Sequence, residues 1–196
     1  MAYQSWSVVF GEQPSAAKWN ILGTNDASFN DGTGIASGAI TYAKVATGFP
    51  VQMTSVGYSS AATGTTTIPF DDTIPQNTEG TEFMTLAITP KSTTNILVID
   101  VVAYMSSSIN TDVIGALFQD STADALAMGI FYENTATARQ MLQIRHRMVA
   151  GTTSSTTFKY RAGPPTAGTV TFNGGGGDRQ FGATTKSSIV ITEYNA

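Results

Sequence analysis

Few side chains in this sequence are suited to acid–base or metal chemistry. His146 is the only histidine among 196 residues and cysteine is absent, which excludes multi-histidine and thiolate metal sites and most nucleophiles activated by imidazole. Asp71 and Asp72 are neighbours in an extended or turn segment and point in different directions, whereas a glycosidase needs two opposed carboxylates about 5–10 Å apart. We therefore expect a protein that is not an enzyme, with His146 as an ordinary strand residue and the two aspartates forming a turn.

Two stretches rich in asparagine, aspartate and glycine look like ion-binding loops but lack their key positions. Residues 25–32 carry oxygen ligands of the kind that calcium prefers, without the alternating acids and the closing glutamate of an EF-hand loop. Residues 173–178 read Asn-Gly-Gly-Gly-Gly-Asp and lack the Lys-Ser/Thr pair and the following helix of a phosphate loop. We expect turns and caps in the first stretch, a mobile hairpin tip in the second, and neither a metal nor a cofactor.

The charge of the chain is low and scattered. Charged residues make up 12% of the sequence, hydrophobic residues make up 41%, and the formal net charge is −4. The ten lysines and arginines form one local cluster, at Arg139 and residues 145–147, so we expect no nucleic-acid binding. No apolar run approaches the roughly 20 residues of a membrane span, and the N-terminus lacks a signal-peptide pattern, so membrane insertion is not expected. With so few charges, much of the surface is expected to consist of Ser, Thr, Gly and Asn or to be buried against other copies of the chain.

The elements that must position any site fall into two regions. Residues 1–64 are expected to form an arm and linker, with one short helix after Ser15 and compact turns after Leu22. Residues 65–196 contain repeated short runs of β-branched and aromatic residues, separated by Gly, Pro, Asn, Asp or Ser clusters. About eight such strands without intervening helices predict an all-β fold, a jelly-roll β-sandwich with a short, partly helical N-terminal arm, and a domain boundary near Gly64.

The strand predicted at residues 95–105 has two apolar faces. Ile96, Val98 and Val102 share one face, and further apolar residues occupy the other. A two-layer sandwich covers one face of each sheet, and this sequence offers no helices for a third layer. We therefore expect a neighbouring subunit to cover the face with Ile96, Val98 and Val102. The strand at residues 141–151 differs, because apolar residues alternate there with glutamine and arginine, which predicts one polar face.

Both ends of the chain carry recognisable patterns. The stretch GEQPSAAKWNILGTNDASFNDGTGI resembles an N-terminal element of tail-fibre-like structural proteins of tailed bacteriophages and prophages; the match is carried by Glu12, Pro14, Ala17, Trp19, Asn20, Leu22, Gly23, Asn25, Asp26, Phe29, Asn30, Asp31 and Gly32. The stretch TFNGGGGDRQFGATTKSSIVITEYNA is similar to the closing hairpin of phage fibre knobs, at Phe172, Gly174, Arg179, Phe181, Gly182, Ser188, Ile191 and Glu193. The strand sizes between them resemble the jelly rolls of the tumour-necrosis-factor and complement-head type, which associate as trimers.

The resemblance implies a short homotrimeric tail fibre or appendage of a phage virion, assembled in the host cytoplasm and binding the host surface. Residues 1–64 would attach it to other virion proteins, through Trp19, Leu22, Phe29 and Ile35. Residues 65–196 would face outward, form the trimer through Ile96, Val98 and Val102, and contact a host glycan or protein through Tyr132, Arg139 and Arg179. A capsid decoration or head-fibre protein is the first alternative. A polysaccharide depolymerase is the second, although the long repetitive β-helix of such enzymes is absent.

Overall fold

The computed structural model describes residues 11, 13, 15–17, 19, 20 and 46–196. The chain divides into two units, Met1–Ala46 and Thr47–Ala196. In the first unit, residues 16, 17, 19 and 20 are helical, and the Trp19 amide donates a hydrogen bond to the Ser15 carbonyl at 3.1 Å. This agrees with the short helix predicted after Ser15. Most of the predicted arm lies outside the described residues.

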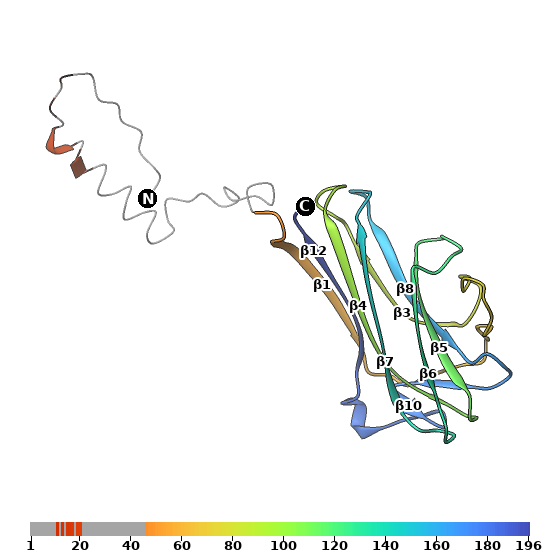
Figure 1. Cartoon of the computed structure of the whole chain (residues 1–196). Helices are drawn as coiled ribbons and strands as arrows, with labels where there is room; N and C mark the ends of the chain where they lie inside the picture. Colours follow the sequence, from red (N-terminus) through yellow and green to blue (C-terminus); the bar gives the residue numbers. More distant parts are fainter. Residues whose placement is uncertain (1–10, 12, 14, 18, 21–45) are drawn as a thin grey trace. The chain divides into compact units, whose positions relative to one another are not determined.

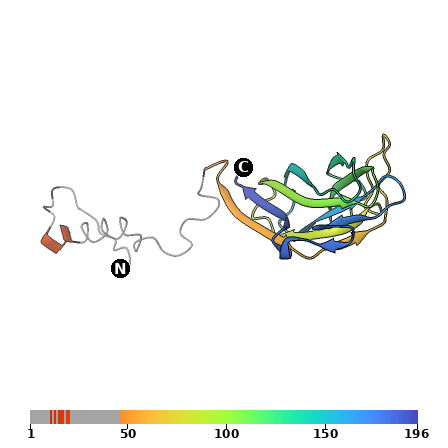
Figure 2. The same cartoon turned by 90° about the horizontal axis from the view of Figure 1, so that it is seen from below.

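The second unit is a sandwich of two antiparallel sheets, seen from two directions in Figures 1 and 2. The strands of the first sheet are β1 (Pro50–Tyr58), β2 (Ala62–Gly64), β4 (Ile96–Ser107), β7 (Gln140–Val149), β9 (Val170–Phe172) and β12 (Ser187–Tyr194). β4 lies between β12 and β7, and β1 pairs with the other edge of β12. β9 and β2 continue the sheet along the far end of β4.

The second sheet has the strand order β3, β8, β5, β6. Its strands are β3 (Thr81–Ile88), β5 (Asp112–Gln119), β6 (Ala127–Tyr132) and β8 (Thr156–Gly163). A small hairpin of β10 (Gly174–Gly175) and β11 (Asp178–Arg179) and the short turn η2 (Phe181–Ala183) precede β12. The all-β prediction of a jelly-roll sandwich is confirmed. In the described part of the chain, no helix has the length and apolar character needed to cross a membrane.

The sandwich begins earlier than the sequence pattern predicts. The predicted boundary lies near Gly64, but the compact unit starts at Thr47. β1 pairs with β12 along its whole length, from Pro50 opposite Tyr194 to the other end of the strand. Residues 47–64 are therefore part of the domain and not a linker. Apolar and polar residues alternate only weakly in this stretch, so the sequence pattern does not predict the strand β1. The partner that stabilises β1 is β12, at the end of the domain sequence.

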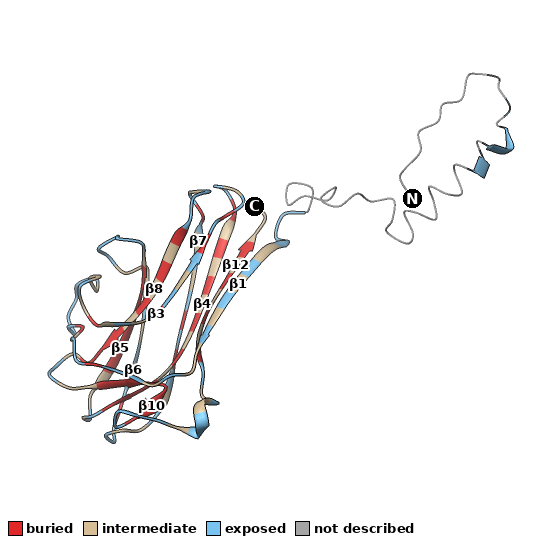
Figure 3. Cartoon of the chain, turned by 180° about the vertical axis from the view of Figure 1, so that it is seen from behind, coloured by how far each residue is buried: buried red, intermediate tan, exposed pale blue. Residues whose placement is uncertain are grey.

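The hydrophobic core lies between the two sheets. β4 supplies fully buried side chains from one of its faces, namely Leu97, Ile99, Val101, Ala103 and Met105. Phe158 and Tyr160 of β8 pack against them from the second sheet. Buried and half-buried residues alternate along β4 and β12, as the change of colour in Figure 3 shows. The predicted division of β4 into two faces is thus confirmed, and its second face points away from the core.

The outer face of the second sheet is covered in part by the chain itself. Ile114, Ala116 and Phe118 of β5 are buried together with Ile68, in a cluster separate from the main core. Ile68 belongs to residues 65–80, which we call the covering segment. The domain therefore supplies a third layer locally from its own chain, which the sequence pattern alone does not reveal.

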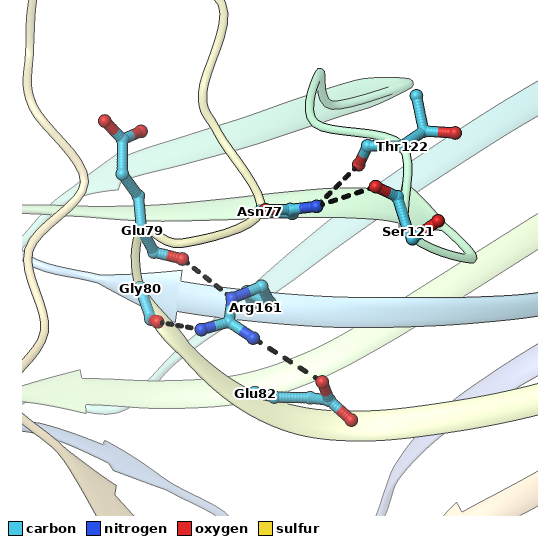
Figure 4. A network of polar contacts seen from close by, with 7 residues as sticks. All are labelled: Asn77, Glu79, Gly80, Glu82, Ser121, Thr122 and Arg161. Atoms are coloured by element: carbon cyan, nitrogen blue, oxygen red, sulfur yellow. Dashed lines mark hydrogen bonds and ion pairs between the residues drawn. The ribbon is translucent and has the colours of Figure 1, made fainter.

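Polar contacts hold the covering segment in place (Figure 4). The Arg161 guanidinium, on β8, donates from Nε to the Glu79 carbonyl and from Nη2 to the Gly80 carbonyl, both at 2.8 Å. Asn77 Nδ2 donates to two carbonyls of the loop after β5, at 3.1 and 3.0 Å. The segment is thereby tied to β8 and to the loop after β5, and it covers the part of this face that β5 builds.

Candidate interaction surfaces

The outer face of the first sheet is built by the outward residues of β4 and their neighbours. Each such residue has one partner on β12 and one on β7, in the rows Thr192–Val98–Arg147, Val190–Asp100–Arg145 and Ser188–Val102–Gln143. Ile96, Val98 and Val102, the predicted trimer interface, therefore occupy one face. We call this surface the first-sheet face.

Large apolar side chains are exposed on the first-sheet face. More than half exposed are Met53 (69%), Met141 (54%) and Val149 (55%). Ile96 and Val98 line a hollow of about 430 Å³. In the middle of the face, Arg145 Nε lies 3.2 Å from Asp100 Oδ1 in an ion pair that water reaches, so the pair adds little to the stability of a single chain. Several large apolar side chains exposed on one face mark a candidate interaction surface.

β7 shows the predicted alternation. Leu142 and Ile144 are buried in the core, whereas Gln143, Arg145 and Arg147 are exposed on the first-sheet face. The polar residues of β7 thus lie directly beside the outward apolar residues of β4, and both belong to the first-sheet face. The first-sheet face thus carries apolar side chains towards both ends of β4 and an exposed ion pair between them.

The end of β6, the start of β7 and the β10–β11 hairpin lie at one end of the sandwich (Figure 1). The three predicted receptor-contact residues belong to these segments. Tyr132 ends β6 and is 60% exposed, and its carbonyl accepts a hydrogen bond from Gln140 Nε2 at 3.0 Å. Arg139 precedes β7, and its guanidinium packs against Gly175 of the hairpin. Arg179 is exposed on the second strand of the same hairpin. Arg139 also lines a pocket of about 530 Å³.

The glycine-rich stretch at residues 173–178 contains most of the β10–β11 hairpin, and its first half is buried in the domain. Gly174 and Gly175 are buried, and the next two glycines form the turn with φ of 65° and 90°, which glycine adopts without strain. Asn173 anchors the start, because its Nδ2 donates to the last carbonyl of β1 at 2.8 Å and its Oδ1 accepts from Ser187 Oγ at 2.7 Å. The prediction of a mobile tip is therefore wrong for the buried half of this stretch.

The described residues that we considered for catalysis, His146 and the Asp71–Asp72 pair, do not form a catalytic site or a metal site with other described side chains. His146 lies on β7, and burial lowers its pKa. Asp71 accepts hydrogen bonds from the hydroxyl and the amide of Thr73, at 2.6 and 2.9 Å, and these bonds hold the pKa of Asp71 below its usual value. This is the turn predicted for it. Among the residues that the structure describes, no three His, Asp or Glu side chains gather as metal ligands. The expectation that the protein is not an enzyme stays a prediction.

Glu133 is a buried acid that sequence analysis missed. It follows β6 and is fully buried; its Oε2 accepts a hydrogen bond from the Ser107 amide, whereas its Oε1 has no partner within the described residues. Burial raises the pKa of the Glu133 carboxyl, and the amides of Ser107 and Ala138 and the charge of Arg139 partly offset this. No local pattern reveals such a residue, because glutamate is seldom fully buried.

The raised pKa of Glu133 makes the stability of the domain depend on pH. The folded state holds the proton more tightly than the unfolded chain, so the stabilisation is fully present below the ordinary pKa of 4.5 and is lost as the pH rises through the folded-state pKa. The Glu133→Gln variant cannot bind this proton. We therefore expect the slope of its unfolding free energy against pH to differ from that of the wild type by up to about 1.4 kcal/mol per pH unit, which is the contribution of one proton. Urea unfolding followed by circular dichroism measures the slope, with the exposed Glu82→Gln as the control. An unchanged slope in Glu133→Gln would contradict the raised pKa.

The predicted docking residues of the arm are mostly outside the described residues. Trp19 is described and is 60% exposed, and its docking role is not tested by this. Leu22, Phe29 and Ile35 and the candidate loop at residues 25–32 lie in the part without described positions.

Several solved structures show a distant likeness to this chain. The structure of Eiger TNF from S. frugiperda is 10% identical over 74% of this chain and 94% of that chain, with a TM-score of 0.43. The EclA C-terminal domain, a sugar-binding protein, is 14% identical over 62% of this chain and 74% of its own, with a TM-score of 0.31. The structure of the Gx strain of infectious bursal disease virus is 10% identical over 77% of this chain and 38% of that chain, with a TM-score of 0.34. No curated protein matches the chain.

A comparison with protein-family profiles identifies the family of this sequence. The profile of the Pgp3 C-terminal domain matches residues 68–196, which include the whole second sheet and most of the first. This family is related to Chlamydia virulence and is not a phage tail family. The prediction of a phage tail fibre, with its alternatives of a capsid decoration protein and a depolymerase, is therefore wrong, and so is the predicted location in a virion. By this match, the chain belongs to the Pgp3 C-terminal domain family.

Proposed function

We propose that residues 47–196 form a non-enzymatic binding domain that assembles as a homotrimer through the first-sheet face. The difference between the two outer faces of the sandwich carries this proposal. The covering segment buries the outward side chains of β5 on the second sheet. The first-sheet face keeps apolar side chains exposed, and within residues 46–196 no segment covers them. Burying this patch against another copy removes the exposed apolar surface from water, which drives association.

A second apolar surface favours a closed ring of copies over a face-to-face dimer. β6, the edge strand of the second sheet, exposes Met128 (47%), Ile130 (41%) and Tyr132 (60%), which we call the β6 stripe. β6 lies close to β7, because a Cβ added to Gly129 would come within 3.1 Å of Leu142 Cδ2. A face-to-face dimer leaves the β6 stripe uncovered. In a ring, the stripe of one copy packs on the first-sheet face of the next, and three copies make the smallest such ring.

Light scattering of the whole protein at micromolar concentration tests the trimer. We expect three times the 20.6 kDa mass of one chain. Val98→Asp places a charge in the middle of the proposed interface, and we expect it to raise the dissociation constant at least about 100-fold, giving monomers. Thr85→Asp is the matched control, because it adds the same charge to an exposed position on β3. A monomeric wild-type protein, or a Val98→Asp variant with an unchanged mass, would refute the proposal.

Ile130→Asp distinguishes the ring from a face-to-face dimer. In the ring, this substitution charges the β6 stripe and weakens association as Val98→Asp does. In a dimer built on the first-sheet face alone, Ile130 stays outside the interface and the mass remains that of two chains. The same light-scattering series, with circular dichroism as a check of folding, decides between them.

A further inference from the structure

A pocket of about 530 Å³ opens at the end of the sandwich beside the β10–β11 hairpin. Its wall comes from four parts of the chain: Tyr104 near the end of β4, Arg139 before β7, Asn173 and Gly174 at the start of the hairpin, and Gln180, Phe181 and residues 184–186, which lead into β12. Binding sites for small molecules are concave and of this size, with an apolar lining and a few polar groups that orient the ligand. The pocket has this size, and distant segments that the fold brings together line it with two aromatic rings, of Tyr104 and Phe181, and six polar side chains.

The pocket is cationic although the chain is acidic. Arg139 and Lys186 line it and no carboxylate does, while the formal net charge of the chain is −4. Within the described residues, neither cation forms an ion pair or a hydrogen bond. The charge of Arg139 acts on Glu133, but that acid is buried and is not part of the lining. Two cations that form no hydrogen bond or ion pair within the described residues, and that line one pocket, favour an anionic ligand.

Gly175 allows Arg139 to approach the hairpin. A Cβ added to Gly175 would lie 2.8 Å from Arg139 Nε and 2.9 Å from Nη2, closer than atoms can pack. The missing side chain thus lets the guanidinium rest against the hairpin backbone at the wall of the pocket. A cation held in place before binding loses less conformational entropy when a ligand arrives.

Phe181 adds an aromatic surface at the rim of the pocket. Its side chain is 75% exposed. Its φ is 51°, followed by 62° at Gly182 and 69° at Ala183, and this left-handed backbone is costly for a bulky residue and is concentrated at functional sites. Thr184 stabilises the turn, because its hydroxyl and amide both donate to the Phe181 carbonyl, at 2.6 and 3.0 Å. The fold thus holds a large ring in water next to the two cations.

We propose that this pocket binds an acidic saccharide. The carboxylate of the sugar lies against Arg139 and Lys186, one face of the ring packs on Phe181, and the hydroxyl groups bind the side chains of Gln180 and Thr185, which also line the pocket. A simple anion would leave the aromatic surface unused, and a neutral sugar would leave both cations unpaired. The proposal does not depend on the trimer, since one chain supplies every residue of the pocket.

Isothermal titration calorimetry of the whole protein at low salt tests the proposal with D-glucuronate, D-glucose and acetate as probes. We expect D-glucuronate to bind at least about 10-fold more tightly than either of the others, because a charged hydrogen bond contributes about 1.5–3 kcal/mol. Equal binding of acetate would show a plain anion site, and equal binding of D-glucose would show that the cations take no part. Either outcome, or no measurable binding of D-glucuronate, overturns the proposal.

Four variants test which residues hold the sugar. Arg139→Gln and Lys186→Gln should each weaken D-glucuronate binding about 10-fold, and Phe181→Ala by a similar factor. Arg179→Gln is the matched control, because Arg179 lies on the same hairpin, is exposed and does not line the pocket. Thermal unfolding checks that each variant is folded, and Lys186→Gln keeps the test valid if Arg139→Gln is not. Unchanged affinity in both cation variants, or an equal loss in Arg179→Gln, would refute the assignment.

Discussion

Glu193→Ala is expected to lower the free energy of unfolding by about 3 kcal/mol. The Glu193 carboxylate is fully buried on β12. Its Oε1 accepts hydrogen bonds from the Lys91 amide at 2.8 Å and from Asn95 Nδ2 at 2.6 Å, and its Oε2 accepts one from Gln52 Nε2. Alanine leaves these donors without their acceptor in a largely buried site, and each unpaired donor costs about 1–3 kcal/mol. The loss affects β1 and the loop between β3 and β4 together, because both are held by this one side chain.

Urea unfolding followed by circular dichroism at one fixed protein concentration measures the effect of Glu193→Ala. Glu193→Gln keeps the shape and one acceptor oxygen, so we expect about half of the loss. Glu82→Ala is the control for removing a negative charge, because Glu82 is an exposed residue 3.5 Å from its cationic partner, and its loss should stay within about 0.5 kcal/mol. A loss below about 1 kcal/mol in Glu193→Ala would mean that water replaces the carboxylate.

Gly163→Ala should destabilise the domain by about 3 kcal/mol, through the covering segment and not through the core. A Cβ at residue 163 would lie 2.2 Å from the Thr66 carbonyl oxygen, which is a backbone atom and cannot rotate away. Thr66 belongs to the covering segment, and the next residues are held close by, since the Ile68 amide donates to the Pro164 carbonyl at 3.1 Å. The added methyl group therefore pushes the segment off β5 and exposes the apolar cluster beneath it.

A matched glycine separates this steric effect from the general effect of adding a methyl group. Gly57→Ala adds a Cβ with no atom within 4 Å, so its unfolding free energy should change by less than about 0.5 kcal/mol. Urea unfolding gives both values, and binding of a hydrophobic dye at low urea reports whether the covering segment has lifted. Equal stabilities for the two variants would show that the segment tolerates displacement.

The parts of the fold that depend on local periodicity could be predicted from the sequence. The two faces of β4 and the alternation of β7 follow from the residue types, because successive side chains of a strand point to opposite faces. β1 was beyond such reasoning, since Val51, Val56 and the residues between them alternate weakly and the strand is stabilised by β12. The burial of Glu133 and Glu193 was beyond it too, because their partners lie far away in the sequence.

For the candidate surfaces, too, features set by local periodicity could be predicted and features set by long-range contacts could not. Ile96, Val98 and Val102 could be assigned to one outward face by parity, whereas the covering of the second sheet by residues 65–80 could not, because it depends on contacts such as those of Arg161. The phage assignment relied partly on residues 11–35, which precede the matched residues 68–196. That N-terminal resemblance stays a prediction, while the functional conclusion drawn from it was wrong.

The position of β12 has a consequence for the growing chain on the ribosome. β12 follows every other strand in the sequence, yet it lies inside the first sheet, between β1 and β4. Until it emerges, β1 has no partner strand, and β4 presents an unpaired, strongly apolar edge. The first sheet therefore closes only after translation has passed residue 194, and a nascent chain that stalls earlier exposes an edge prone to aggregation.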